Sequence, residues 1–173
     1  LGSFVLHVGA RGYYKQFWLM VDKIKDYLIK NNIKIICAGG GKFTKFENNY
    51  MFNHNLNNLI IQKDCTDTEL ANLYSNALCL IVPSKQEGFC IPIIEAFQCG
   101  CPVLANDIEI FHEIGSDAII YFNINKTVSI KKSLRNINQL KNRKHFVKEG
   151  KKIIKRYSWK NSADKTVEVY RYI

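Results

Sequence analysis

Short apolar runs rich in β-branched residues recur through the first 123 residues of the 173-residue chain, with more polar stretches between them. The runs are FVLHV, IKIICA, LIIQ, CLIVP, PVLA and AIIYF. The intervening stretches carry helical periodicity or helix-boundary signals, and strands that alternate with helices form parallel sheets. The pattern therefore predicts an α/β fold, a Rossmann-like open parallel sheet of about six strands with helices on both faces.

Two of the predicted helices have specific boundary signals. Thr66 opens TDTELANLYSNA with Glu69 three residues later, which is the spacing of a capping box. Pro92 suits the first turn of a helix and Gly100 suits its C-terminal stop, so PIIEAFQCG is predicted to be a short helix.

The chain changes character after Phe122, where it becomes lysine-rich and helical without a further strand. We predict a single domain, with a strand and helix core over about residues 4–123 and a basic helical segment over about 126–173. Residues 131–160 hold 12 of the 25 Lys and Arg residues but only one of the 15 acids, Glu149. Such a segment could meet nucleic acid or an anionic membrane surface, or form a solvated helix face.

The remaining composition argues against several kinds of protein. No apolar run approaches the roughly 20 residues that a membrane span needs. Cys37 and Cys79 lie in strand-like runs and the four histidines are scattered, so we expect reduced thiols and no structural metal site. The N-terminal LGSFVLHVGARG lacks a secretory signal and enters a strand almost at once. We therefore expect a cytoplasmic protein, and a chain that is a piece of something longer.

An open parallel sheet binds its ligand at the carboxyl ends of the strands, where the strand order reverses. The residues that follow the predicted strands are candidates for this crevice. In strand order they are Gly9 to Arg11, Gly39 to Gly41, Asp64 to Thr66, Ser84 to Phe89, and Asn106 with Asp107.

The stretch SKQEGFCIPIIEAFQCGCPVLAN places Glu87 after the fourth strand and Glu95 about one turn into the following helix. Between them the backbone amides approach a helix N-terminus, which favours a phosphate. Ionised carboxylates accept hydrogen bonds from vicinal hydroxyls, so a diphosphate with a sugar on each end fits this arrangement. The spacing alone equally allows a surface helix residue at Glu95 and a turn residue at Glu87. The amides concerned belong to Gly88, Phe89, Cys90 and Ile91.

Two cations follow the first predicted strand, in VGARGYYKQFWLMV. Arg11 and Lys15 lie at the entry to a helix, where both could face the crevice and neutralise a diphosphate. The alternative is that both are solvated side chains.

The stretch VPSKQEGFCIPIIEAFQCGCPVLAND resembles the PS-x-x-EGFG-x-P-x-x-EA-x-x-x-G-x-PV-x-A-S/N block of glycosyltransferase family 4, with its E-x7-E pair. The similarity is to the C-terminal, donor-binding domain of these retaining enzymes of the GT-B fold, and it runs from about Phe4 to Ile173. Other matching stretches are LHVGARGYYK, ICAGGG, TDTELANLYSNA, FHEIGSDAIIYFN and RYSWKNSADKTVEVY.

The resemblance implies a role for each matching residue. Glu95 would bind the ribose hydroxyls, and Glu87 would contact the hydroxyls of the transferred sugar. Arg11 with Lys15 would bind the diphosphate and stabilise the departing charge. Cys90 stands where the family usually has glycine, which bears on how closely the sugar can approach. The other implied contacts are Gly9 at the end of the first strand, the amides of Gly88, Phe89, Cys90 and Ile91 on the distal phosphate, and Cys65, Thr66 and Asp67 around the base.

The implied activity is transfer of a hexose from a UDP-, GDP- or ADP-sugar to an acceptor in glycan, polysaccharide or glycolipid synthesis. The sequence contains no Asp-x-Asp and offers an Arg and Lys clamp, so we expect no metal and no further cofactor. The resemblance further implies that the N-terminal acceptor domain of the GT-B fold is absent from this chain. The expectation is that the chain binds nucleotide without turnover and that the missing N-terminal domain is its partner.

Other functions remain open from the sequence. A GT-B relative such as a nucleotide-sugar epimerase or a sugar phosphorylase is the enzyme alternative. A nucleic-acid-binding module that uses residues 131–160 is the non-enzyme alternative, although aromatic residues for base stacking are sparse there. The same segment could instead hold the intact enzyme at an anionic membrane, where a lipid-linked acceptor would be found.

Overall fold

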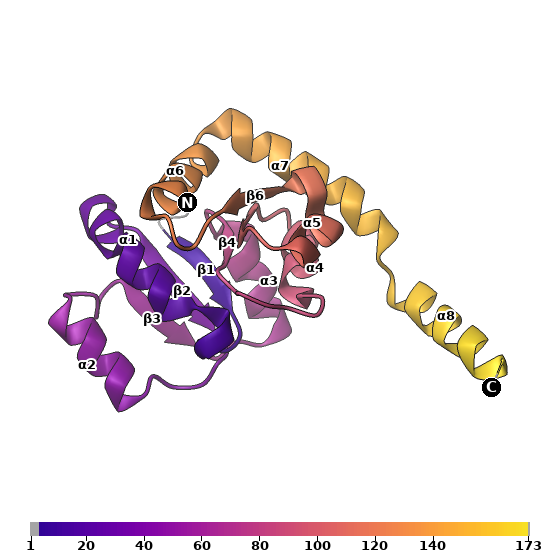
Figure 1. The fold of residues 1–173 in the computed structure, drawn as a ribbon, viewed down its shortest axis with the longest axis horizontal. Helices are drawn as coiled ribbons and strands as arrows, with labels where there is room; N and C mark the ends of the chain where they lie inside the picture. The colour runs from indigo at the N-terminus through magenta and orange to yellow at the C-terminus, as the bar shows by residue number, and fades with distance from the viewer. Residues whose placement is uncertain (1–3, 173) are drawn as a thin grey trace.

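The computed structural model describes residues 4–172 and confirms the predicted fold class (Figure 1). Six parallel strands form one open sheet in the order β3-β2-β1-β4-β5-β6. The strands are β1 (Phe4–Val8), β2 (Lys34–Ala38), β3 (Ile60–Lys63), β4 (Leu80–Val82), β5 (Val103–Asn106) and β6 (Ile119–Phe122).

Helices cover both faces of the sheet. They are α1 (Phe17–Asn31), α2 (Lys45–Asn53), α3 (Asp67–Asn76), α4 (Ile91–Gln98), α5 (Glu109–Gly115), α6 (Thr127–Ile137), α7 (Leu140–Ile153) and α8 (Trp159–Arg171). Buried residues of α1, α2 and α6 pack on one face, and those of α3, α4, α5 and α7 pack on the other.

The alternation along each strand explains the two cores. Successive side chains of a strand point to opposite faces, so a strand covered on both sides is apolar at every position. Val5 of β1 packs with the α1 face and Leu6 with the α3 face. In β2, Ile35 and Ile36 divide in the same way. These continuous apolar runs are the strand signals of the sequence.

The predicted helix boundaries are confirmed. Thr66 caps α3, its hydroxyl accepting from the Glu69 amide while the Glu69 carboxylate accepts from the Thr66 amide. Pro92 lies in the first turn of α4, and Gly100 follows that helix with a φ of +68°. Such a left-handed conformation suits glycine, which has no Cβ to clash.

The basic segment forms α6, α7 and α8. The first two helices pack on the body of the domain, whereas α8 extends away from it (Figure 1). No residue of α8 is buried. Within residues 4–172 none of the helices combines the length and the apolar character that crossing a membrane would require. The six cysteines are free, and Cys37, Cys79 and Cys101 are buried.

The strand order reverses between β1 and β4, because β2 and β3 lie on one side of β1 while β4, β5 and β6 lie on the other. The loops that leave β1 and β4 therefore bound the crevice where an open α/β sheet holds its ligand.

Candidate functional site

Glycines bring the loops after β1 and β2 into contact at this crevice. Gly9 has a φ of +103°, and its amide donates to the Ala38 carbonyl 2.9 Å away. A Cβ on Gly40 would lie 2.6 Å from the Gly9 oxygen, so no other residue fits there without a shift of the backbone. The glycines thus allow the close contact between the two loops, beside the position of Arg11 in the chain.

An ion pair joins the two sides of the crevice. Lys15 ends a short 3-10 turn after β1, and its Nζ donates to Glu87 Oε1 over 2.7 Å. The side chains are 17% and 9% exposed, respectively. Burial opposes the charged form of Lys15, but the hydrogen bond and charge of Glu87 more than offset this and raise the pKa of Lys15. The Lys85 amide also donates to the Tyr14 carbonyl, so the β4 loop is tied to the turn that carries Lys15.

Glu95 has a separate protein partner. It lies on α4, and its Oε2 accepts from the Tyr74 hydroxyl of α3 over 2.8 Å. Tyr74 is only 1% exposed. Burial, followed by the charge and hydrogen bond of Glu95, raises the pKa of this phenol, so Tyr74 remains a donor at neutral pH. Tyr74 is not among the residues predicted from the sequence, because its spacing in the helix is simply that of a core residue.

The turn between the two acids contains a residue in the left-handed conformation. Cys90 is the N-cap of α4 with φ 68° and ψ 68°, a left-handed conformation that glycine adopts most easily. The backbone therefore keeps a shape suited to glycine although a thiol occupies the position. The first turn of α4 follows this residue, beside the end of β4. Its free backbone amides form a helix N-terminus, where an anion is favoured.

Arg11 lies against the glycine loop. Its Nε donates to Glu47 Oε1 over 2.9 Å, and its Nη2 donates to the Gly41 carbonyl over 3.0 Å. Its side chain is 4% exposed, and the guanidinium stacks 4.6 Å from the centroid of Phe43. The donors of Arg11 are thus directed at Glu47 and at the loop after β2, and within residues 4–172 Arg11 forms no hydrogen bond with Lys15 or Glu87. Its role on a diphosphate remains a prediction.

Glu47, the partner of Arg11, is not among the residues predicted from the sequence. It closes a second capping box with Thr44, and its Oε1 also accepts from Trp18 Nε1 over 2.8 Å. Burial would raise the pKa of Glu47, but the bonds from Arg11, Thr44 and Trp18 lower it to about 2. The stretch TKFE carried the signal, since it has the same spacing as the box at Thr66.

Cys65, Thr66 and Asp67 lie where the edge strand β3 leads into α3. The Thr66 hydroxyl is occupied in the capping box, and Cys65 is half-buried. Their link to the acid pair is α3 itself, which begins at Asp67 and carries Tyr74 to Glu95.

Two hollows adjoin these groups. One, of about 720 Å³, is lined by residues that include Arg11, Trp18 and Lys85. The other, of about 760 Å³, is lined by residues that include Glu95 and Trp159. Among residues 4–172 there is no cluster of three or more His, Cys, Asp or Glu side chains with the arrangement of a metal site.

A family model described as Glycosyl transferases group 1 matches residues 2–163. The chain belongs to the glycosyl transferases group 1 family. It is 29% identical over 138 residues to the O-antigen chain mannosyltransferase RfbU of Salmonella typhimurium. The matched region covers 80% of this chain and 39% of that protein. It is 30% identical over 171 residues to an uncharacterized glycosyltransferase of Methanocaldococcus jannaschii, covering 97% and 48%. The chain thus spans less than half the length of these two relatives.

Solved structures of GT-B glycosyltransferases share the fold. Anabaena HepE in complex with UDP and glucose superposes with a TM-score of 0.85 at 15% identity, over 99% of this chain and 49% of that one. Sucrose-phosphate synthase from Thermosynechococcus elongatus gives a TM-score of 0.82 at 20% identity, over 99% and 46%. The group 1 domain therefore has the Rossmann-like sheet of these enzymes.

Proposed function

We propose that the chain is the C-terminal, donor-binding domain of a retaining glycosyltransferase of family 4. The enzyme would transfer a hexose from a nucleotide diphosphate sugar to an acceptor in glycan, polysaccharide or glycolipid synthesis. The observation that carries the proposal is the pair of acids around a helix N-terminus at the switch point, each accepting from a different protein donor, Lys15 for Glu87 and Tyr74 for Glu95. The O-antigen mannosyltransferase among the relatives makes mannose the first hexose to test.

The geometry supports a division of labour along the donor. Lys15 would meet the diphosphate, because an ammonium has three donors and Glu87 occupies one of them. Glu87 would contact the transferred sugar, whereas Glu95 would hold the ribose through the carboxylate oxygen that Tyr74 does not use. The amides of Gly88, Phe89, Cys90 and Ile91 would hold the distal phosphate, Gly9 would let the donor approach β1, and Cys65, Thr66 and Asp67 would border the base.

Retaining transfer requires a stabilised leaving diphosphate and an acceptor hydroxyl delivered to the same face of the sugar. Lys15 and the N-terminus of α4 would supply the positive potential where the charge develops. This potential is the basis for proposing metal-independent donor binding. The two acids would position the donor through its hydroxyls and would not attack the anomeric carbon.

The acceptor would bind elsewhere in the protein, because the relatives are more than twice as long as the matched region. We therefore propose that this chain alone binds nucleotide and transfers no sugar. Product analysis of the intact protein distinguishes sugar transfer from the action of an epimerase or a phosphorylase.

Calorimetry with UDP, GDP, ADP and their hexose conjugates, with and without a chelator, tests the proposal. One nucleotide diphosphate should bind in the presence of the chelator. Lys15→Ala should weaken the affinity for this nucleotide by roughly 10- to 150-fold, because a charged hydrogen bond contributes about 1.5–3 kcal/mol. Lys30→Ala, on an exposed turn of α1, is the matched control and should bind normally. Binding of no nucleotide refutes the donor site, and strict magnesium dependence refutes the metal-free clamp.

A further inference from the structure

One face of α7 carries a row of cations together with two apolar side chains. Its members are three or four residues apart, which places them on the same side of the helix. They border a shallow groove of about 390 Å³. Leu140, at the start of the row, is 68% exposed. The groove-lining residues, here named the α7 basic face, are Leu140, Arg143, Lys144, Val147, Lys148 and Lys151.

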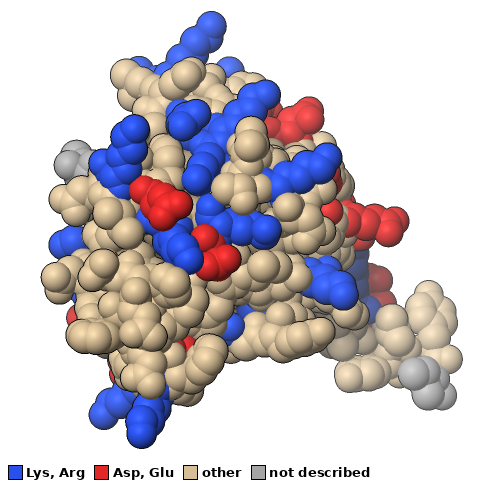
Figure 2. All heavy atoms as spheres, turned by 60° about the vertical axis from the view of Figure 1, so that its left-hand side comes forward, with Lys and Arg blue, Asp and Glu red and all other residues tan. Residues whose placement is uncertain are grey.

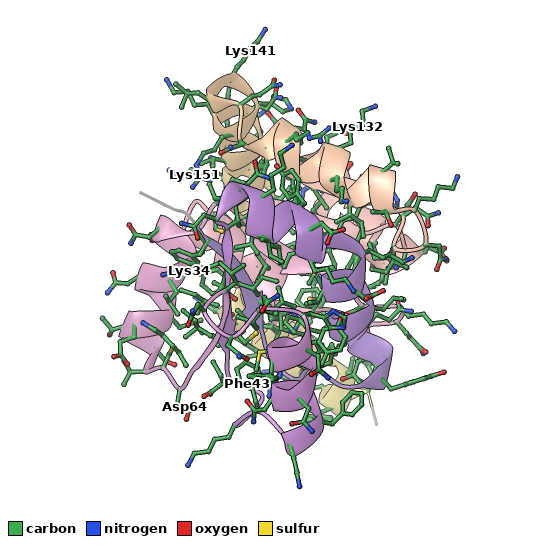
Figure 3. All side chains as sticks on the ribbon, turned by 90° about the vertical axis from the view of Figure 1, so that its left-hand side faces the viewer. Lys34, Phe43, Asp64, Lys132, Lys141 and Lys151 are labelled. Atoms are coloured by element: carbon green, nitrogen blue, oxygen red, sulfur yellow. The ribbon has the colours of Figure 1, made fainter. Side chains whose placement is uncertain are left out.

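The α7 basic face lies at the end of the sheet where the parallel strands begin. This end is called the amino edge here, and the end where the strands finish is called the carboxyl edge. Arg143 donates to the carbonyls of Ala77 and Leu78, in the short segment between α3 and β4. A Cβ on Gly100, which precedes β5, would lie 3.6 Å from Val147. Figure 3 shows the same separation, with Lys132, Lys141 and Lys151 toward one end of the molecule and Phe43 and Asp64 toward the other. The donor crevice lies at the carboxyl ends of the strands, so the two surfaces are on opposite edges.

Close packing holds α7 in this orientation. A Cβ on Gly150 would lie 2.6 Å from the ring of Phe97, so α7 and α4 meet at the distance that only glycine allows. Ile153 is buried in the same core. The cations on the opposite side of the helix therefore stay directed outward.

Little negative charge neutralises this surface. Within residues 4–172 the ion pair formed by α7 is Lys152 with Glu149, over 2.8 Å, while Lys144, Lys148 and Lys151 are exposed and have no ion-pair partner. Figure 2 shows Lys and Arg gathered over the upper part of the molecule, with some acidic side chains between and beside them.

We propose that the α7 basic face binds an anionic lipid surface. Leu140 is exposed and Val147 is half-buried among these cations. Apolar side chains beside lysines are typical of a helix that lies in a membrane interface, because the lysine stems cover apolar surface while their ammonium groups reach the headgroups. Nucleic acid is a poorer fit. Arg143 is occupied by backbone carbonyls, and Phe146 packs partly buried against the core where it cannot stack on a base.

The position of the face sets the geometry of binding. A domain that rests on its amino edge directs the donor crevice away from the lipid, so the nucleotide remains free to enter. Lipid binding and nucleotide binding should therefore be independent, and the lipid inference does not rest on the proposed donor site.

The test is sedimentation of the folded chain with phosphatidylcholine vesicles, with or without phosphatidylglycerol. We expect binding only to the anionic vesicles at low salt, and a loss of at least tenfold at about 0.5 M salt, where the screening length is short. The variant K144E/K148E/K151E should lose binding by at least tenfold. Leu140→Ser should weaken binding less and leave the salt dependence unchanged.

The matched control is K42E/K45E/K63E, with the same change of charge on exposed lysines near the carboxyl edge. Unchanged melting temperatures verify that both triple variants are folded. Equal binding to neutral and anionic vesicles, or equal loss in both triple variants, would overturn the proposal. So would tighter binding to a DNA duplex than to anionic vesicles at the same salt. Addition of the nucleotide should leave vesicle binding unchanged, and a loss would disprove the opposite-edge geometry.

Discussion

The variant Glu47→Gln tests how much the ion pair between Arg11 and Glu47 stabilises the fold beside the crevice. The pKa of Glu47 falls from 4.5 to about 2, which corresponds to about 3 kcal/mol of folding free energy at neutral pH. A glutamine oxygen can still accept one of the bonds from Arg11 and Trp18. We therefore expect the free energy of unfolding at pH 7 to drop by about 2–3 kcal/mol.

The loss should depend on pH with a definite sign. A carboxylate whose folded pKa is depressed stabilises the fold fully above its unfolded pKa and loses this contribution as pH falls through the folded value. For Glu47 the window runs from pH 4.5 down to about 2. Because glutamine does not titrate, the difference between the two proteins should be full at pH 7 and clearly smaller at pH 3.

Urea unfolding at pH 7, 5 and 3 measures both quantities. Glu69→Gln is the matched control, since Glu69 closes the other capping box at an exposed position without an arginine. It should destabilise the protein much less. Equal losses in the two variants, or a difference that does not change with pH, would refute the ion-pair reasoning.

Nucleotide affinity should stay unchanged in Glu47→Gln, because three loop carbonyls still hold Arg11. Tighter binding would show that the freed Arg11 reaches the phosphates.

Other variants test the acids and the packing. Glu95→Ala should weaken nucleoside diphosphate binding by roughly 10- to 150-fold in calorimetry, for the loss of a charged hydrogen bond to the ribose. Glu87→Ala should leave that affinity nearly intact but lower kcat of the intact enzyme more than it raises KM, and the reverse pattern for the two acids would exchange their roles. Tyr74→Phe should weaken nucleotide binding less than Glu95→Ala, measured in the same way. Gly150→Ala should lower unfolding stability by about 1–2 kcal/mol in urea, because overpacking against Phe97 outweighs the better helix propensity of alanine.

Local patterns predicted most of the fold. Continuous apolar runs marked the strands because both faces of the sheet are covered, and the box at Thr66 marked the start of α3. The orientation of α8 was not predictable, since an amphipathic pattern shows which side of a helix is apolar but not what covers it.

In the candidate site, too, the sequence predicts some residues but not the contacts between distant ones. The sequence located Glu87 and Glu95 because one short segment carries both. It could not pair Lys15 with Glu87, 72 residues away, nor assign Tyr74 to Glu95, because these contacts depend on how strands and helices pack. Arg11 shows the limit most clearly. A cation at a strand end suggests a phosphate, yet the loop after β2 offers it three carbonyls and the first turn of α2 offers it a carboxylate.

The partners of the two acids explain why their roles should differ. The Lys15 ammonium has donors to spare after it binds Glu87, so it can join that carboxylate to a phosphate, and the pair can respond together as charge moves onto the leaving group. The Tyr74 hydroxyl has a single proton and gives it to Glu95. This fixes one oxygen of Glu95 and leaves the other as a stationary acceptor. A stationary acceptor suits a part of the donor that does not change in the reaction, whereas a carboxylate coupled to a cation suits the part that does.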